Sequence, residues 1–562
     1  FSKMGLNPGE VELIFFLMAL ATSNLTAAFE LSNNFSKPIS CNYVYFYKKL
    51  HLHFLFFSKT LINYQPLLNT MTHTSQELAT FCKKKGFIYR SSEIYGGLAG
   101  FYDYGHLGTS LKHNFQDLWR GYFLSLHDNF HEIEASEIMH EKVFKASGHL
   151  DNFVDPITKC SECQVNYRAD HLIEGAINKR VEGLIPEQLT NLIEENEIKC
   201  PNCKSDLMPV EVMNMMFPVQ LGVGGTHKGY LRPETAQSPF VNFKLQFELL
   251  RKKIPMGLAM IGRAYRNEIS PRNLTLRQRA FTQAELQIFF NPSKVNEHPD
   301  FEKVKDYPLR VMLQEDREAN MVVERTAQEL VDRGLPKFYV FHLAYIQKLY
   351  LTELSVPKEK FRLYELDDKE KAFYNKNHFD IEIDLNSHGF TEMGGLHYRT
   401  DHDLKGHQEV SKEKMDVVDE TTGEKFIPHV LELSFGVDRN VYALLDLNYH
   451  KGEQRGNDVL ALPSVFTPFY CAVFPLVKNK DPVVSKARDV YNQIHGRFSC
   501  FYDQSSSVGK RYARADEIGT KYCITIDFET LEDECVTVRD RDTTEQQRIK
   551  IVDLLDYLQK NQ

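Results

Sequence analysis

The spacing of hydrophobic and polar positions along the chain predicts a succession of helices and strands. Apolar residues that recur every three to four positions predict amphipathic helices at 107–126, 188–197 and 241–253. Alternating positions predict strands at 208–220, 257–268 and 280–290. The last two are long, and the basic loop SPRNLTLRQR joins them into an antiparallel pair. Shorter strands are predicted at 379–385, 394–398 and 430–434, followed by a helix at 440–447.

Two segments differ in character from these strands. Residues 291–376 are highly charged, and their pattern predicts a mostly helical insertion. Near Pro463 the pattern changes again, because strand and helix signals alternate from there to the end of the chain. This alternation predicts an independent α/β domain at 463–562.

The first seventy residues have no clear caps or turns. Leu13 to Ala21 is an apolar run that is too short to span a bilayer, and only Lys3 supplies a positive charge before it. A targeting segment is one interpretation. The favoured interpretation is that Met71 is the natural start and that 1–70 is an extension outside the mature protein, because the amphipathic pattern begins directly after Met71. This interpretation predicts a cytoplasmic protein.

The composition is that of a globular protein, and the net charge does not indicate a nucleic-acid partner. Of 562 residues, 42% are hydrophobic and 25% are charged, and the net charge is −9. Contact with RNA would therefore depend on local basic surface rather than on the field of the whole molecule. The ten cysteines are too few for a disulfide scaffold and suit a reducing compartment.

Four of the cysteines form two CxxC pairs, in the contexts KCSEC and KCPNC. Two thiolates separated by two residues can coordinate the same tetrahedral ion. Two such pairs complete a closed site that leaves no coordination position for a substrate. We therefore predict a structural Zn²⁺ site at Cys160, Cys163, Cys200 and Cys203, within an insertion at about 155–210. Two chance pairs of free thiols are the alternative.

The two long strands carry a cluster of charged and aromatic residues near their shared loop. Arg266 and Glu268 alternate with Asn267 and therefore point the same way, and Phe281 and Glu285 follow on the second strand. A guanidinium group suits phosphate oxygens, a ring can lie against a base, and a carboxylate can bind an amine or Mg²⁺. The cluster can therefore hold a nucleotide, and a solvated salt-bridge face is the alternative.

Two further segments place functional side chains beside a tight backbone. In ELSFGVDR a strand delivers Glu432 and Ser434 to one side, Gly436 permits a turn, and Arg439 lies near the start of a helix, where anions bind. The segment RPETAQ follows the loop LGVGGTHKG, which has neither the GK[ST] nor the GxGxxG spacing. The sequence thus argues against a Walker or Rossmann nucleotide site, and ordinary helix caps are the alternative for both segments.

Together these segments resemble the glycyl-tRNA synthetases of the archaeal and eukaryotic-like homodimeric branch of class II. The likeness covers nearly everything after Met71. SSEIYGGLAGFYDYG resembles the family's opening, RPETAQ its glycine-site segment, GRAYRNEISPR with FTQAELQIFF its motif 2, and PHVLELSFGVDR its motif 3. HYRTDHDL is similar to the strand before motif 3, and VGKRYARADEIGT with TVRDRDTTEQ to the anticodon-binding domain.

The resemblance implies an α+β fold with a class II catalytic domain at 71–462 and a C-terminal α/β anticodon-binding domain at 463–562. The implied catalytic sheet is antiparallel and six-stranded, with helices beside it and insertions within it. The implied activity is that of a glycine--tRNA ligase, which uses ATP with Mg²⁺ to form glycyl-adenylate, releases pyrophosphate and transfers glycine to the 3′ end of tRNA(Gly). A homodimer without membrane attachment is the implied assembly.

The resemblance also implies roles for individual residues. The implied catalytic residues are Arg266 at the α-phosphate, Glu268 at the adenine amine and Arg439 at the γ-phosphate. The rest of the implied ATP site consists of Asn267, Leu276, Arg277, Phe281, Glu392, Met393 and Gly436. The implied glycine site consists of Arg168, Glu234, Phe281, Glu285, Glu432, Ser434 and Gly436. Glu392 and Glu432 are the implied Mg²⁺ ligands.

Two other functions are weighed against this one. A synthetase-like, non-catalytic RNA-binding accessory protein would typically lack the motif 2 and motif 3 arginines, but Arg266 and Arg439 are present. A class II enzyme specific for another amino acid, hydrophobic or hydroxylated, is the second alternative. The acidic residues Glu234, Glu285 and Glu432 argue against it and for glycine. Carboxylates suit the ammonium of glycine, and a pocket closed over its α-carbon would reject every larger amino acid without an editing site.

Overall fold

The computed structural model describes residues 73–562, apart from residues 180, 182, 373, 420–421 and 453–454. The prediction for residues 1–70 therefore concerns a segment outside the described residues. Within the described part of the chain, every helix is too short or too polar to cross a membrane.

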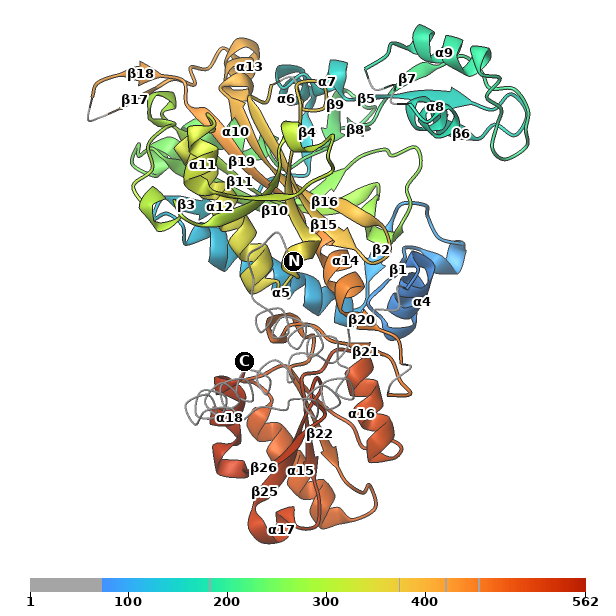
Figure 1. Cartoon of the computed structure of the whole chain (residues 1–562), viewed down its shortest axis with the longest axis vertical. Helices are drawn as coiled ribbons and strands as arrows, with labels where there is room; N and C mark the ends of the chain where they lie inside the picture. The colour runs from blue at the N-terminus through green and yellow to red at the C-terminus, as the bar shows by residue number, and fades with distance from the viewer. Residues whose placement is uncertain (1–72, 180, 182, 373, 420–421, 453–454) are drawn as a thin grey trace, which may run out of the picture. The chain divides into compact units, whose positions relative to one another are not determined.

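A nine-stranded mixed sheet lies at the centre of the larger domain (Figure 1). Its strands, in spatial order, are β13 (Val323–Thr326), β12 (Pro308–Met312), β14 (Phe361–Glu365), β15 (Asn377–Leu385), β16 (Gly389–Thr400), β19 (His429–Gly436), β11 (Ala280–Phe290), β10 (Met256–Tyr265) and β3 (Phe130–Glu132). The six strands from β14 to β10 are all antiparallel to their neighbours, as predicted. Outside these six, β12 pairs with β14 in parallel and β3 pairs with β10 in parallel, which extends the sheet.

Residues 291–376 differ from their prediction as a mostly helical insertion. They contain α11 (Ala327–Asp332) and α12 (Lys337–Lys348), but they also supply β12, β13 and β14 to the central sheet. These strands have only four or five residues each, and charged segments surround them. Such short apolar alternations are hard to distinguish from helix in sequence, and pairing with distant strands decides their conformation.

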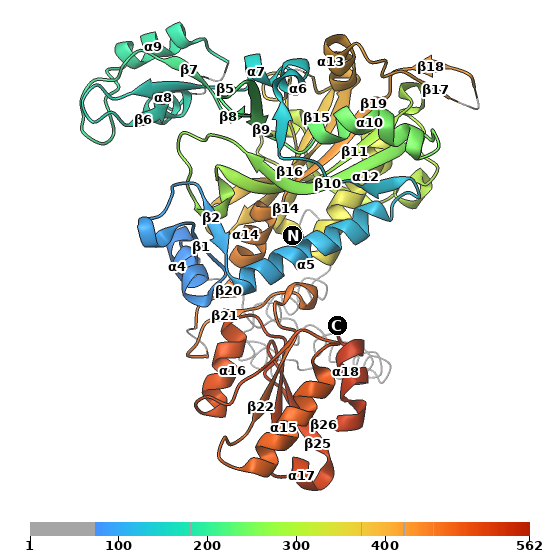
Figure 2. The ribbon, with the colours of Figure 1, turned by 180° about the vertical axis from the view of Figure 1, so that it is seen from behind.

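Helices pack against both faces of the sheet. On the first face, α5 (His106–Leu124) packs beside α12 and α14 (Val437–Asn448), and Figure 2 shows α5 running along the sheet. Buried apolar residues recur every four positions in α5, at Leu107, Leu111, Phe115, Trp119 and Phe123. On the second face, α10 (Gln237–Leu249) and α13 (His402–Ser411) cover one region through a separate core.

The alternation of side chains along β11 divides polar from apolar residues. Ala284, Leu286 and Ile288 enter the core beneath α5, α12 and α14. Glu285, between them, must therefore face the second side of the sheet. The same rule sends Leu431, Leu433 and Phe435 of β19 into the core. The part of the second face that α10 and α13 leave uncovered thus carries polar side chains.

An insertion between β3 and β10 forms two small sheets. One consists of β6 (Asn166–Arg168), β5 (Val154–Lys159) and β7 (Glu211–Asn214), with α8 (Ala169–Ile177) and α9 (Pro186–Glu195) beside it. The other consists of β4 (Ile138–His140), β9 (His227–Leu231) and β8 (Phe217–Leu221). The single strand predicted at 208–220 is therefore two strands, β7 and β8, which belong to different sheets.

The C-terminal domain is built on a five-stranded sheet with its own apolar core. In spatial order its strands are β23 (Cys500–Tyr502), β22 (Cys471–Pro475), β24 (Tyr522–Ile526), β25 (Cys535–Asp540) and β26 (Gln546–Lys550). Its main helices are α15 (Asp481–Ile494), α16 (Val508–Glu517) and α18 (Leu554–Lys560). The predicted α/β character is confirmed, whereas β26 was not expected because it is a polar, mostly exposed edge strand.

Candidate active site

The uncovered part of the sheet holds a cavity of about 260 Å³. Its walls come from β11, β16 and β19, from the segment after β10, and from the start of α14. Thirteen of the predicted site residues line it: Glu234, Arg266, Glu268, Leu276, Arg277, Phe281, Glu285, Glu392, Met393, Glu432, Ser434, Gly436 and Arg439. Segments that are far apart in sequence are thus gathered around one space.

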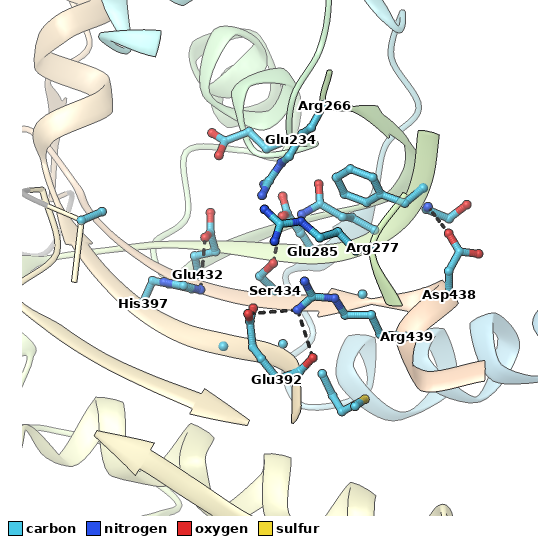
Figure 3. A pocket seen from close by; sticks show the side chains of 18 of the residues that line it. Glu234, Arg266, Arg277, Glu285, Glu392, His397, Glu432, Ser434, Asp438 and Arg439 are labelled. Atoms are coloured by element: carbon cyan, nitrogen blue, oxygen red, sulfur yellow. Dashed lines mark hydrogen bonds and ion pairs between the residues drawn. The ribbon is translucent and has the colours of Figure 1, made fainter. Parts of the chain in front are cut away.

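Three guanidinium groups point into this cavity, those of Arg266, Arg277 and Arg439 (Figure 3). Arg266 Nε donates to the carbonyl oxygen of Pro233 at 3.0 Å, and its guanidinium carbon lies 5.3 Å from the centre of the Phe281 ring. Arg277 Nε donates to a carboxylate oxygen of Glu268 at 2.8 Å. Each arginine is therefore held by a contact that leaves other N–H groups to bind an anion.

Arg439 joins motif 3 to the neighbouring strand β16. Its Nη1 lies 2.9 Å from Glu392 Oε2 and 3.0 Å from the carbonyl oxygen of Glu392, and its Nε donates to the carbonyl oxygen of Leu276 at 3.1 Å. Burial alone would raise the pKa of Glu392, but the charge and hydrogen bond of Arg439, together with His378 and Arg266, outweigh burial and keep that pKa below its ordinary value. Glu392 is therefore a carboxylate at neutral pH.

A group of buried carboxylates lies beside the arginines, on β11, β19 and the segment before α10 (Figure 3). Glu285 accepts hydrogen bonds from Thr235 Oγ1 at 2.7 Å and from Ser434 Oγ at 3.0 Å. Burial, with the charges of Glu432 and Glu234, raises the pKa of Glu285 to about 8. This wall of the cavity therefore holds a proton at neutral pH and attracts a cation that could replace it.

Arg399, which is not among the predicted site residues, holds the other two carboxylates in place. Its side chain is 2% exposed and lies 3.1 Å from Glu432 and 3.7 Å from Glu234, while Asp403 binds it through two oxygens at 2.8 and 3.0 Å. Burial opposes ionisation of Glu234, but His149 and then Arg399 lower its pKa below the ordinary range. The available signal was the alternation of Arg399 with His397 in the segment HYRTDHDL.

Asp438 is a second residue that the sequence analysis missed. It accepts hydrogen bonds from Tyr104 Oη at 2.6 Å, from Lys112 Nζ at 2.9 Å and from the backbone N–H of Thr282 at 2.5 Å. It therefore ties α5 to β11 directly beside Phe281 and Arg439. Its position next to Arg439 in sequence was the only local signal.

Two predicted site residues lie outside the cavity walls. Asn267 donates its backbone N–H to the carbonyl oxygen of Met215 at 2.7 Å, which connects the segment after β10 to the insertion. Arg168 lies on β6, where it pairs with Asp155 and Asp170. Their roles at ATP and at glycine stay predictions.

The four cysteines of the insertion come together as predicted. Their sulfur atoms all lie within 4.8 Å of one another, with 3.3 Å between Cys160 and Cys203 and 3.6 Å between Cys163 and Cys200. Tetrahedral Zn²⁺ with Zn–S bonds of about 2.3 Å requires sulfur separations of about 3.8 Å, so the arrangement fits. In the described residues this is the only group of three or more potential metal-binding side chains in such mutual reach.

An antiparallel sheet with arginines, an aromatic ring and carboxylates around one cavity, and without a phosphate-binding glycine loop, defines a class II aminoacyl-tRNA synthetase. Comparison with known proteins specifies the family. The chain is 37% identical to the glycine--tRNA ligase of Thermococcus sibiricus, covering 87% of this chain and 99% of that one. It is 38% identical to that of Pyrococcus furiosus, covering 84% and 96%. The chain belongs to the glycine--tRNA ligase family, a family of ligases.

Two further comparisons agree with the fold. Residues 470–561 match the model of an anticodon binding domain. The crystal structure of the RNA binding domain of threonyl-tRNA synthetase from Cryptosporidium parvum superposes with a TM-score of 0.52 at 16% identity, covering 86% of this chain and 98% of that one. The sequence-based assignments of fold class and family are therefore confirmed.

Proposed function

We propose that the chain activates glycine with ATP and then transfers it to the 3′ end of tRNA(Gly). The observation that carries this proposal is the arrangement of three arginines and a buried acidic group around one cavity. In the activation step the glycine carboxylate attacks the α-phosphate, so two anions must approach each other in line. Positively charged groups fixed on a rigid sheet reduce that repulsion without a protein nucleophile.

The cationic residues suit the phosphates of ATP. Arg266 is placed to hold the α-phosphate, and Arg439 the γ-phosphate with help from Arg277, while the Phe281 ring stacks on adenine and Glu268 binds the adenine amine. Glu392 and Glu432 would hold Mg²⁺, which neutralises phosphate charge when it is bound. The two carboxylates engage different arginines, Arg439 and Arg399.

The acidic residues suit the ammonium group of glycine. Glu234, Glu285 and Glu432 line the same cavity. Hydrogen bonds from Thr235 and Ser434 hold Glu285, one from Arg399 holds Glu432, and one from Gln237 holds Glu234. A carboxylate wall that is already fixed binds an ammonium without having to be ordered first.

The remaining proposals concern the metal, the assembly and tRNA. The four-cysteine cluster fits a structural Zn²⁺ ion, which closes the insertion and takes no part in the chemistry. A homodimer is supported by the exposed apolar residues Ile94, Tyr95 and Leu98 of the family's opening segment. The C-terminal domain would bind the anticodon of tRNA(Gly). The domain limits at 70 and 462 stay predictions.

Exchange of labelled pyrophosphate into ATP, measured with each amino acid in turn, tests the activity. We expect glycine alone to stimulate exchange, because the acidic wall binds an ammonium and the cavity excludes larger amino acids. Exchange that no amino acid stimulates would favour the accessory-protein alternative. Stimulation by alanine or serine but not by glycine would contradict the specificity.

The raised pKa of Glu285 predicts a pH dependence of glycine affinity. Below about pH 8 the binding of an ammonium must displace the proton on Glu285, so we expect the dissociation constant of glycine to fall as pH rises from about 6 to about 8. At most, the dissociation constant of glycine should fall about tenfold for each pH unit. Calorimetry in buffers of different ionisation enthalpy should detect the released proton, and an affinity that does not change with pH would contradict the assignment.

The same group affects the stability of the folded chain. The pKa of Glu285 is raised from 4.5 to about 8 by folding, so the folded state binds more protons than the unfolded state between these values. The contribution of Glu285 to the free energy of unfolding is therefore favourable at low pH and declines as pH rises from about 4.5 to about 8.

A further inference from the structure

The three-stranded sheet of the insertion connects the four-cysteine cluster to the ATP pocket. Cys160 directly follows the last residue of β5, and Phe153 directly precedes its first residue. At the cluster end, the backbone N–H of Met208 donates to the carbonyl oxygen of Lys159 at 2.8 Å, and that of Cys160 to Val165 at 3.0 Å. One continuous strand therefore has the cysteines at one end and the pocket at the other.

The pocket end of this sheet holds Arg266 and its neighbour. The guanidinium carbon of Arg266 lies 5.4 Å from the Phe153 ring centre and 5.3 Å from that of Phe281, so both rings contact the same cation. The backbone N–H of Asn267 donates to the carbonyl oxygen of Met215 at 2.7 Å, and the N–H of Met215 donates to the carbonyl oxygen of Phe153 at 3.1 Å. The ends of β5 and β7 thus fix both the side chain and the backbone at Arg266.

The third strand brings charge to the same region. Arg168, the last residue of β6, pairs across the strand register with Ile157 of β5. Burial would lower the pKa of Arg168, but Asp170 and Asp155, with a smaller contribution from Glu268, raise it. Arg168 is therefore within electrostatic reach of Glu268, which lines the ATP pocket.

The insertion has too little apolar core to hold this geometry by itself. The cluster between its sheet and helices contains seven buried residues: Ala169, Ile173, Val181, Leu189, Ile193, Ile198 and Val210. Small units of this kind usually need a disulfide or a metal for stability. The four cysteines could bind such a metal, which would join β5 to the segment before β7, since Cys160 and Cys203 are 43 positions apart in the chain.

We infer that metal binding at the four cysteines positions Arg266 for ATP, with Phe153 and Met215 as the positioning residues that connect the two sites. The inference rests on the proposed function, because it assigns Arg266 to ATP. Loss of the metal loosens β5 and β7, removes the ring beneath Arg266 and releases the backbone of Asn267. The catalytic arginine is then present but no longer fixed.

The test compares two variants of the full chain with a matched control. Cys160→Ser combined with Cys203→Ser should lose the metal, lose hydrogen-exchange protection over 154–159 and 211–214, and bind ATP about tenfold or more weakly. Phe153→Ala should weaken ATP binding in the same direction while keeping the metal and the protection. Cys535→Ser, a thiol of the C-terminal domain, should change none of these. Hydrogen-exchange protection in β22 and β24 that matches wild type would show that the C-terminal domain is still folded.

If the double variant fails to fold, chelation of the metal from the wild-type chain, followed by addition of Zn²⁺, provides the same comparison. The inference is supported if ATP affinity falls when the metal is removed and recovers when Zn²⁺ is added. A wild-type chain that contains no metal, or a metal-free chain with unchanged ATP affinity, overturns it. Failure of the proposed function is distinguishable, since it appears as wild-type exchange that glycine does not stimulate.

Discussion

Replacement of Arg266 by alanine is expected to reduce glycine-dependent pyrophosphate exchange by a factor of about 10²–10³, which corresponds to roughly 2.7–4 kcal/mol of transition-state stabilisation. The reason is electrostatic. In the proposed activation step negative charge increases on the α-phosphate as the glycine carboxylate attacks. Pro233 and two aromatic rings hold the guanidinium of Arg266 in the cavity that we propose for that phosphate. Alanine leaves a space that water fills without the same orientation.

Arg263→Ala is the matched control, because Arg263 is exposed on β10, three residues before Arg266, and lies outside the cavity. It should keep the exchange rate within about twofold of wild type, since isolated exposed charges contribute little. Circular dichroism and the melting temperature of Arg266→Ala should match those of wild type, which excludes a loss of fold. Normal exchange in folded Arg266→Ala would disprove the assigned role.

Replacement of Glu285 by glutamine is expected to lower kcat/KM for glycine by about 10²-fold, because a hydrogen-bonded charged partner is worth roughly 1.5–3 kcal/mol. Glutamine keeps the shape but has no charge for the ammonium. Glutamine also has only one acceptor oxygen, whereas the two carboxylate oxygens of Glu285 accept separate hydrogen bonds from Thr235 and Ser434. The change should appear mainly in glycine binding, and ATP affinity should stay within about twofold.

Two features make this prediction specific. The pH dependence of glycine affinity should disappear in Glu285→Gln, since the titrating group is gone. Glu365→Gln is the control: Glu365 is a partly buried carboxylate on β14, burial raises its pKa as well, and it lies outside the cavity. A variant at Glu285 with wild-type kinetics for glycine would show that the ammonium binds elsewhere.

Much of the site could be read from the sequence because its information is local. A period of two along β11 and β19 separates Glu285, Glu432 and Ser434 from the apolar residues between them, and the structure places all three in the cavity. The CxxC spacing predicted the cysteine cluster in the same way, since the geometry of each pair is set within four residues. The order of the family-like segments then determined the class of fold and the family.

The tertiary structure alone decided how these local units act on one another. The alternation of Arg399 with His397 indicates only that the two share a face; the pairing of β16 with β19 brings Arg399 to Glu432, and the helix after β16 supplies Asp403. The raised pKa of Glu285 depends on burial and on two carboxylates from other segments. The strands hidden in 291–376 and the contact of Phe153 with Arg266 likewise depend on partners distant in the chain. A sequence pattern records which face a residue takes, whereas strand register and burial, which fix its neighbours and its charge, arise only when distant segments pack together.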